Sequence, residues 1–287
     1  MQKVKIITDS ASDLPNEYFE KYNISMLPMG IVIDDKTYLD RVELGADEFF
    51  EIMRNNPKSL PTTVMPSVET IEAEFTKNLD TYENQIYVSI SSKGSGAYGI
   101  AKIVKEQIEE RLGKPSNITI IDSLSYSVGY AIVVKEMARL AYEGADYKTV
   151  MNYYENRRKK IDVLMVVDDL MHLKRGGRIK PTVAYVGEML GIKPLLTIKD
   201  GLIDSFGKAR GKRRAMEKMA EILISKAGKP EETEIWIVHT NAQDDAEEFK
   251  KIVEEGITPK EITISQLGAC IGVHMGEGLI GVIYDTA

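Results

Sequence analysis

Cysteine is almost absent from this chain of 287 residues, which contains only Cys270. A single thiol excludes an internal disulfide and any metal site built from several cysteines, and its apolar neighbours predict a buried structural thiol. Histidine is nearly as rare, and His172, His239 and His274 show no zinc-type spacing such as His-Glu-x-x-His. We therefore expect neither a metal site nor a cofactor.

Long apolar runs are absent as well. No uncharged apolar stretch approaches the roughly 18 residues that a membrane-spanning helix needs. The first residues, Met1–Ile7, contain no apolar stretch that ends at a small-residue cleavage site. The chain has 43% hydrophobic and 28% charged residues, a composition typical of globular proteins. The sequence therefore predicts a cytoplasmic protein without an integral membrane segment.

A positive net charge is missing too, since the formal charge is −7 at pH 7. Nucleic-acid binding usually depends on a broad basic surface, so nucleic acid is not an expected partner. The basic residues are nevertheless clustered, at residues 157–160, 174–180 and 208–214. These clusters are either solvated faces or local surfaces for an anionic ligand or an acidic partner.

The stretch from Ile86 to Ala101 is the most informative part of the sequence. An apolar strand pattern is followed by the turn Ser91–Gly96, which reads SSKGSG, and then by a helical pattern. The turn has neither the Lys-Ser/Thr ending of a Walker loop nor a three-glycine dinucleotide fingerprint. A helix start offers unpaired backbone N–H groups and the positive end of a dipole. We therefore expect a small anion such as a carboxylate here, in preference to a nucleotide.

Strand and helix patterns alternate along the first half of the chain, which predicts an α/β domain with a mostly parallel sheet flanked by helices. The expected strands are 4–8, 24–33, 86–90 and 118–121, and the expected helices are 16–21, 46–54, 68–79, one that carries Ile100 and Ile108, and 127–141. Three strand ends are rich in Ser, Thr and Asp, and ligands bind at the carboxyl ends of strands in such sheets. Ordinary helix capping explains the same residues equally well.

A helix expected near residues 147–160 leads into a second half with a mixed sheet. The expected strands are 163–167, 193–198, 202–206, 235–238, 262–265 and 280–284, and the expected helices are 212–226 and 244–255. The pair Asp200-Gly201 between two apolar runs predicts a β-hairpin. We therefore predict two domains, an N-terminal α/β domain at 1–160 and a C-terminal mixed α/β domain at 161–287.

Two segments of the second half could carry chemistry. His274 stands in the glycine-rich string Gly272–Gly278, which we expect to be a turn that lets a ligand approach the backbone. The string Leu173–Pro181 places arginines around two glycines, and guanidinium groups suit carboxylate or phosphate. A structural histidine and a helix C-cap at Gly176-Gly177 with solvated arginines are the alternative interpretations.

Five motifs follow one another in a fixed order along the chain. They are TDSASDLP at 8–15, PTTVMPS at 61–67, SSKGSGAY at 91–98, LKRGGRI at 173–179 and HMGEG at 274–278. Together they resemble the motifs of the DegV family, the bacterial fatty-acid-binding proteins. The resemblance spans nearly the whole chain, and five ordered motifs are far more specific than any one alone.

The resemblance implies a lipid carrier that is not itself an enzyme. It implies one long-chain fatty acid, similar to palmitate, in a buried tunnel between the two domains, with its carboxylate held by hydroxyl groups and a histidine. It also implies a possible partner, the ATP-binding subunit of a fatty acid kinase, which phosphorylates the bound acid. By position the ligand-binding residues fall on Thr63, Ser95 and His274, with Thr62, Ser92 and Gly96 in the same motifs, and the phosphotransfer arginines fall on Arg175 and Arg210.

The chain departs from the family pattern close to these residues. Val64-Met65 replaces Ser-Gln, Gly94, Ala97 and Gly99 stand where Leu, Thr and Gln are common, and Met275 and Glu277 stand where Thr and Pro are usual. Glu277 would place a negative charge near a bound carboxylate and disfavour its binding, unless it points away or is protonated. The alternative functions are a small-molecule phosphotransferase or hydrolase that uses His274 with a serine, and a lipid-sensing regulator that acts through the 208–214 cluster.

Overall fold

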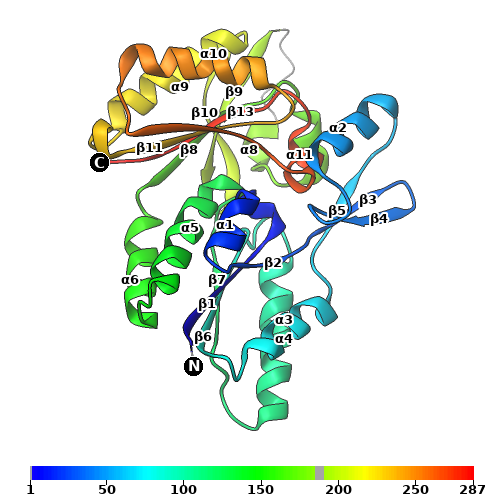
Figure 1. The fold of residues 1–287 in the computed structure, drawn as a ribbon. Coiled ribbons are helices and arrows are strands. Elements are labelled where there is room, and N and C mark those ends of the chain that lie inside the picture. The colour runs from blue at the N-terminus through cyan, green and yellow to red at the C-terminus, as the bar shows by residue number, and fades with distance from the viewer. Residues whose placement is uncertain (1, 185–190) are drawn as a thin grey trace. The chain divides into compact units, whose positions relative to one another are not determined.

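The computed structural model describes residues 2–184 and 191–287 and contains two compact units (Figure 1). The first unit comprises Met1–Glu43 and Thr63–Lys159, and the second comprises Leu44–Thr62 and Lys160–Ala287. The segment from Leu44 to Thr62 groups with the second unit, where its helix α2 (Ala46–Asn55) contacts α11 (Ala269–Met275). The domain ranges 1–160 and 161–287 stay a prediction.

The first unit is built on a four-stranded parallel sheet with the strand order β2-β1-β6-β7. Its strands are β1 (Gln2–Asp9), β2 (Ser25–Leu27), β6 (Tyr82–Ser89) and β7 (Ile118–Asp122). Figure 1 shows α3 and α4 on one side of this sheet and α5 and α6 on the other. The helices are η1 (Ser10–Ser12), α1 (Asn16–Lys21), α3 (Val68–Asn78), α4 (Ala97–Leu112), α5 (Val128–Tyr142) and α6 (Tyr147–Arg157). The predicted parallel sheet flanked by helices is confirmed.

The single extended run expected at 24–33 is wrong, because the chain forms two strands there that belong to different sheets. Strand β2 ends just before Pro28, and β3 (Gly30–Ile33) belongs to the three-stranded sheet β4-β3-β5, with β4 (Lys36–Leu39) and β5 (Thr62–Val64). Proline has no N–H for a ladder, so the parallel sheet cannot continue through that position. Strand β2 also begins late, at Ser25 opposite Ile7.

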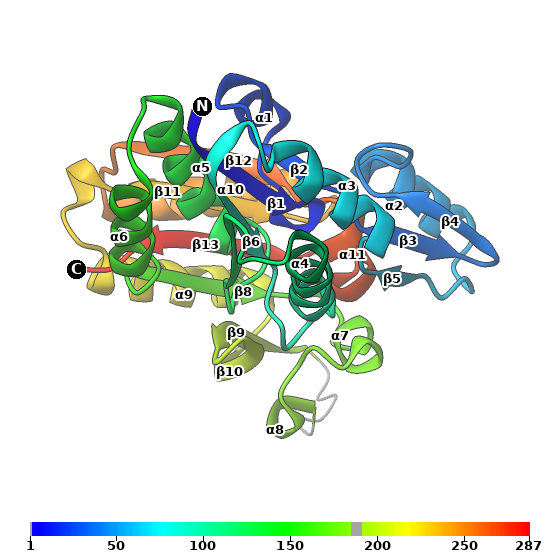
Figure 2. The same ribbon diagram turned by 90° about the horizontal axis from the view of Figure 1, so that it is seen from below.

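The second unit contains a mixed six-stranded sheet with the order β10-β9-β8-β13-β11-β12. Its strands are β8 (Ile161–Val166), β9 (Ile192–Lys199), β10 (Leu202–Arg210), β11 (Glu234–His239), β12 (Glu261–Gln266) and β13 (Ile280–Asp285). The predicted hairpin joins antiparallel strands β9 and β10, and Asp200 and Gly201 adopt φ angles of +54° and +77° in its turn. Figure 2 shows β8 beside β13. The expected mixed α/β architecture is therefore confirmed.

Helices α9 (Lys212–Lys226) and α10 (Gln243–Gly256) pack on this sheet. The sequence spacing explains why: Ala215, Met219 and Leu223 recur every fourth residue and are all buried against the strands. The remaining helices are α7 (Met171–Gly176), α8 (Pro181–Ala184) and η2 (Pro230–Glu232). None of the described helices combines the length and apolarity needed to cross a membrane.

The expected turn at Gly272–Gly278 is wrong in its first half, because helix α11 extends to Met275. Gly272 allows this helix to pack closely against α2. A Cβ atom at that position would lie 2.8 Å from Cζ of Phe50, on helix α2. Only the last glycines form a turn, and Gly276 and Gly278 adopt φ angles of +68° and +86°.

Candidate functional site

The loop Ser91–Gly96 turns the chain from the end of β6 into α4. The carbonyl oxygen of Ser91 accepts hydrogen bonds from the N–H groups of Gly94 (2.9 Å) and Ser95 (3.0 Å). The N–H groups of Gly96 and Tyr98, at the start of α4, have no hydrogen-bond partner among the described residues. These donors and the positive end of a 16-residue helix can bind a carboxylate.

One serine of this loop makes a local contact of the kind that the capping alternative predicts, and a second is tied to the end of β7. The Oγ atom of Ser95 accepts the N–H of Ala97 at 3.2 Å, and the N–H of Ser92 donates to Asp122 at 3.0 Å. A hydroxyl group can accept and donate at once, and the O–H of Ser95 has no acceptor in the described part of the chain. Ser95 can therefore accept the N–H of Ala97 and still donate to a ligand, whereas Ser92 is exposed.

Bulky neighbours occupy the space beside the glycines of the loop. A Cβ atom at position 94 would lie 2.5 Å from the Tyr126 ring, and one at Gly96 would lie 2.7 Å from Sδ of Met65. Tyr126 thus fills the space that a leucine would need at position 94. Met65, in turn, lies against Gly96 at the start of α4. Thr63 is half-buried in this segment and Thr62 is exposed.

Asp9 is a residue of the site that the sequence did not single out. Its carboxylate is fully buried and accepts hydrogen bonds from the N–H of Ile90 (2.9 Å), Tyr87 Oη (3.1 Å) and Tyr130 Oη (2.6 Å). Burial raises the pKa of Asp9 to about 6, and these three donors oppose the rise. Because Ile90 precedes the loop directly, Asp9 ties the end of β1 to the start of the Ser91–Gly96 loop.

In the second unit, His274 occupies the last turn of α11 and is half-buried. Burial, together with the positive charges of Arg178 and His172, lowers the pKa of His274 to about 4. At neutral pH the imidazole is therefore uncharged, with one N–H group that can donate. Its Nδ1 atom lies against Gly176, where a Cβ atom would come within 2.6 Å.

Arg175 belongs to helix α7, whose C-cap is Gly177 with a φ of +68°. Gly177 is therefore the C-cap, whereas Gly176 is the last residue of the helix. The Arg175 side chain is exposed and lines a cavity of about 480 Å³ together with Phe49, Phe50 and Met53 of α2. Arg210, the last residue of β10, is also exposed.

Glu277 is neutralised by its neighbours within the second unit. Its Oε1 atom accepts hydrogen bonds from Nη1 of Arg54 at 2.9 Å and from Nδ2 of Asn241 at 3.0 Å. The side chains of Arg54 and Glu277 are both well exposed, so solvent screens this ion pair and its contribution to stability is small. The arginine nevertheless offsets the negative charge that Glu277 adds to the motif.

The sequence and the fold were compared with known proteins. A family model described as "Uncharacterised protein, DegV family" matches residues 3–287. A DegV domain-containing protein of Clostridium acetobutylicum is 33% identical over 287 residues, which cover 99% of each chain. Among solved structures, a Thermus thermophilus DegV family protein described by its fatty acid binding has a TM-score of 0.88 at 27% identity, with coverage of 99% of this chain and 100% of that chain.

Two further structures are similar over the whole chain. DegV of Bacillus subtilis, described as a fatty acid binding protein, has a TM-score of 0.87 at 26% identity. The match covers 100% of this chain and 100% of that chain. A stearic acid-binding protein of Eubacterium ventriosum has a TM-score of 0.87 at 26% identity, with 100% of this chain and 98% of that chain covered.

We predict that Asp9→Asn changes how stability depends on pH. Between about pH 4 and 6 the folded protein keeps a proton on Asp9 that the unfolded chain releases, so stability falls as the pH rises through this window. This decrease in the free energy of unfolding, on the order of 3 kcal/mol, should be absent from the Asp9→Asn variant. Urea unfolding from pH 4 to 7 measures it. Tyr130→Phe, which removes a donor, should move the window to higher pH, and parallel curves for wild type and Asp9→Asn would contradict the prediction.

We predict that Gly176→Ala displaces the His274 imidazole and destabilises the protein by about 1–3 kcal/mol, because the new methyl group overlaps Nδ1. Gly177→Ala is the matched control. No atom lies within 4 Å of its added Cβ, but its positive φ costs about 1 kcal/mol. Urea unfolding gives both energies. In NMR spectra only Gly176→Ala should shift the His274 ring signals, so unchanged signals in that variant would disprove the contact.

Proposed function

This chain belongs to the DegV family, and on that premise we propose that it binds one long-chain fatty acid as a cytoplasmic lipid carrier. The observation that carries the proposal is the full-length similarity to three structures described as fatty-acid-binding proteins. Burial of an acyl chain gains roughly 0.8 kcal/mol per CH₂ group, so the tail would supply most of the affinity. The tunnel between the domains that the family resemblance implies is part of this proposal.

The proposal assigns the carboxylate to donors from three motifs. A carboxylate is costly to bury unless it is hydrogen-bonded, and the hydroxyl groups of Thr63 and Ser95 with the N–H of Gly96 would satisfy it in part. His274 would donate one further N–H as a neutral imidazole. Thr62 and Ser92 are exposed, which supports only a peripheral role for them.

We further propose that the bound acid is presented to the ATP-binding subunit of a fatty acid kinase, which would form the acyl phosphate. The exposure of Arg175 and Arg210 supports this role, because a guanidinium group that serves a partner or a transferred phosphate must be accessible. In this reaction the present chain is the non-catalytic subunit.

Native mass spectrometry of the purified protein, followed by extraction of its ligand, tests the carrier function directly. A fatty acid bound in a one-to-one ratio is the expected result. A protein that arrives empty and takes up no added palmitate would refute the proposal. Turnover of an acyl ester or an acyl phosphate by the isolated chain would instead support the hydrolase or phosphotransferase alternative, and a salt-dependent gel shift would support a regulator that binds DNA.

We predict that Ser95→Ala and Thr63→Val each weaken palmitate binding by about 1–3 kcal/mol, because each leaves part of the carboxylate without a donor. Calorimetric titration of the delipidated protein measures the change. Ser116→Ala and Thr81→Val remove hydroxyl groups outside the motifs and should leave the affinity unchanged. Unchanged affinity in both site variants would refute the site assignment and leave fatty acid binding intact.

We predict that Arg175→Ala leaves palmitate binding unchanged but slows acyl-phosphate formation on the order of tenfold, which corresponds to about 1.4 kcal/mol in the transition state. The assay combines the loaded protein, the kinase subunit and ATP. Arg111→Ala, which removes an exposed arginine paired with Glu72 in the first unit, is the charge-matched control. A loss of palmitate binding without a kinase effect would reverse the proposed division of roles.

A further inference from the structure

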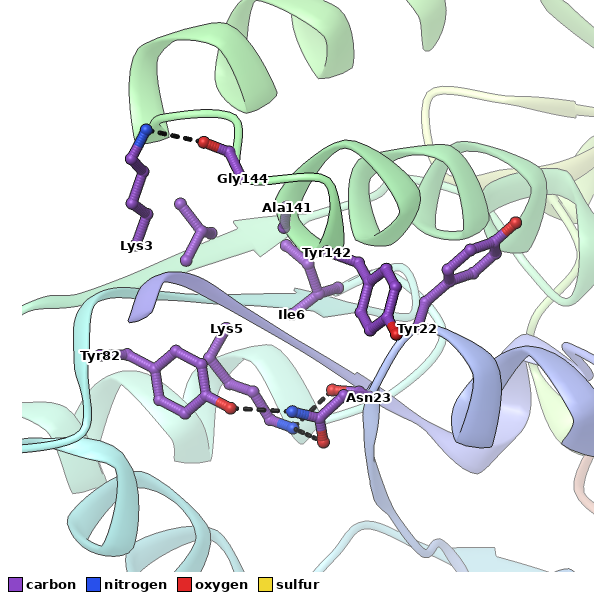
Figure 3. Close-up of a pocket in the computed structure, with 10 residues that line it drawn as sticks. Lys3, Lys5, Ile6, Tyr22, Asn23, Tyr82, Ala141, Tyr142 and Gly144 are labelled. Atoms are coloured by element: carbon purple, nitrogen blue, oxygen red, sulfur yellow. Dashed lines mark hydrogen bonds between the residues drawn. The ribbon is translucent and has the colours of Figure 1, made fainter. Parts of the chain in front are cut away.

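The outer edge of β1 carries a pocket that the proposed function does not use. Strand β1 pairs with β6 from Gln2 to Thr8 but with β2 only from Ile7 onward, so the edge Lys3–Ile6 has no strand neighbour in the described part of the chain. These four consecutive residues line a cavity of about 400 Å³ (Figure 3). Its other walls are Tyr22, Asn23, Tyr82, Ala141, Tyr142 and Gly144.

Lys5 extends into this region and is held there by neutral groups. Its side chain is only 5% exposed. Its Nζ atom donates to the carbonyl oxygen of Asn23 at 2.5 Å and to Oδ1 of the same residue at 3.1 Å, and it lies 5.7 Å from the centre of the Tyr82 ring (Figure 3). Nδ2 of Asn23 donates to Tyr82 Oη at 2.9 Å, which fixes the amide.

No carboxylate among the described residues lies within ion-pair distance of Lys5 Nζ. A buried ammonium group without a carboxylate partner is costly, so this environment favours the neutral amine. The neutral amine has two N–H groups, which match the two acceptors of Asn23 and leave the nitrogen lone pair unshared. Burial lowers the pKa of Lys5 to about 8, opposed by the negative charge of Glu74 and assisted by the positive charge of Lys77. A desolvated lysine of this kind is a nucleophile near neutral pH.

The pocket also suits a particular reagent. Lys3 lines it and none of the lining residues is acidic, so the charge of Lys3 attracts an anionic molecule on a chain that is otherwise acidic. A volume of about 400 Å³ exceeds that of one water molecule, roughly 30 Å³, more than tenfold, which leaves room for a short acyl group and a phosphate.

We propose that Lys5 is a modification site at which small acyl phosphates acylate the side-chain amine. The lone pair of Nζ attacks the carbonyl carbon, a C–N bond forms, and the C–O bond to the phosphate breaks. Phosphate leaves with the bonding electron pair, and the surplus proton of the amine passes to solvent. The product is a neutral amide whose remaining N–H can donate to one of the two Asn23 acceptors.

Acetyl phosphate tests this proposal on the full-length wild-type protein. We expect acetylation of Lys5 at pH 7.5 to be on the order of tenfold faster than that of Lys3, because burial lowers the pKa of Lys5 and so raises its reactive neutral fraction. The rate at Lys5 should reach half its maximum near pH 8. Lys3 is the matched control, since it lies on the same strand and lines the same pocket but is exposed. Mass spectrometry with fragmentation resolves Lys3, Lys5 and the terminal amine.

The same reaction in urea separates an effect of the pocket from an effect of neighbouring sequence. In the unfolded chain Lys3 and Lys5 should react at equal rates, and Lys5→Arg should abolish the fast phase of the folded protein while the rate at Lys3 is unchanged. A rate at Lys5 equal to or below that at Lys3 in the folded protein would overturn the proposal. So would a preference for Lys5 that persists in urea.

Discussion

The buried carboxyl group of Asp9 is the constraint on which the candidate site of the first unit depends. A carboxylate removed from water without donors costs several kcal/mol, and here three donors from β6, the residue after it and α5 surround it. The hydrogen bonds hold the ends of β1 and β6 and the α5 helix in one arrangement. Since Ile90 comes directly before Ser91, the backbone of the Ser91–Gly96 loop begins at a point that Asp9 determines.

Three of the departures from the family pattern, Gly94, Met65 and Glu277, have physical explanations in their contacts. The Tyr126 ring packs against Gly94, and the Met65 thioether packs against Gly96. Each glycine leaves room for the bulky side chain because it has no Cβ atom of its own. Likewise, the negative charge of Glu277 is offset by an ion pair with Arg54. Arg54 belongs to the segment Leu44–Thr62, which is part of the second unit.

The two candidate groups of binding residues use electrostatics in different ways. In the first unit the donors are backbone N–H groups and hydroxyl groups at the start of a helix, where the dipole favours an anion. In the second unit the imidazole of His274 is kept neutral by burial and by the charges of Arg178 and His172. Both arrangements provide hydrogen-bond donors without a fully buried positive charge.

The sequence by itself determined the local structure of most of the chain. Helix α1 at 16–21 and helix α9 at 212–226 begin and end where the pattern predicts, and the hairpin turn follows from Asp200-Gly201 alone. Periodicity, capping residues and turn residues act over a few positions, so they can be read locally. The ordered motifs likewise identified the family.

Only the tertiary structure decided which residues are buried beside which partners. The burial of Asp9 requires Tyr87 and Tyr130, which lie 78 and 121 residues away along the chain. The neutral environment of Lys5 depends on Asn23 and Tyr82, and on a strand β2 that begins too late to cover the edge of β1. Local patterns contain no information on such long-range pairing, because desolvation and hydrogen bonding depend on what the fold brings into contact.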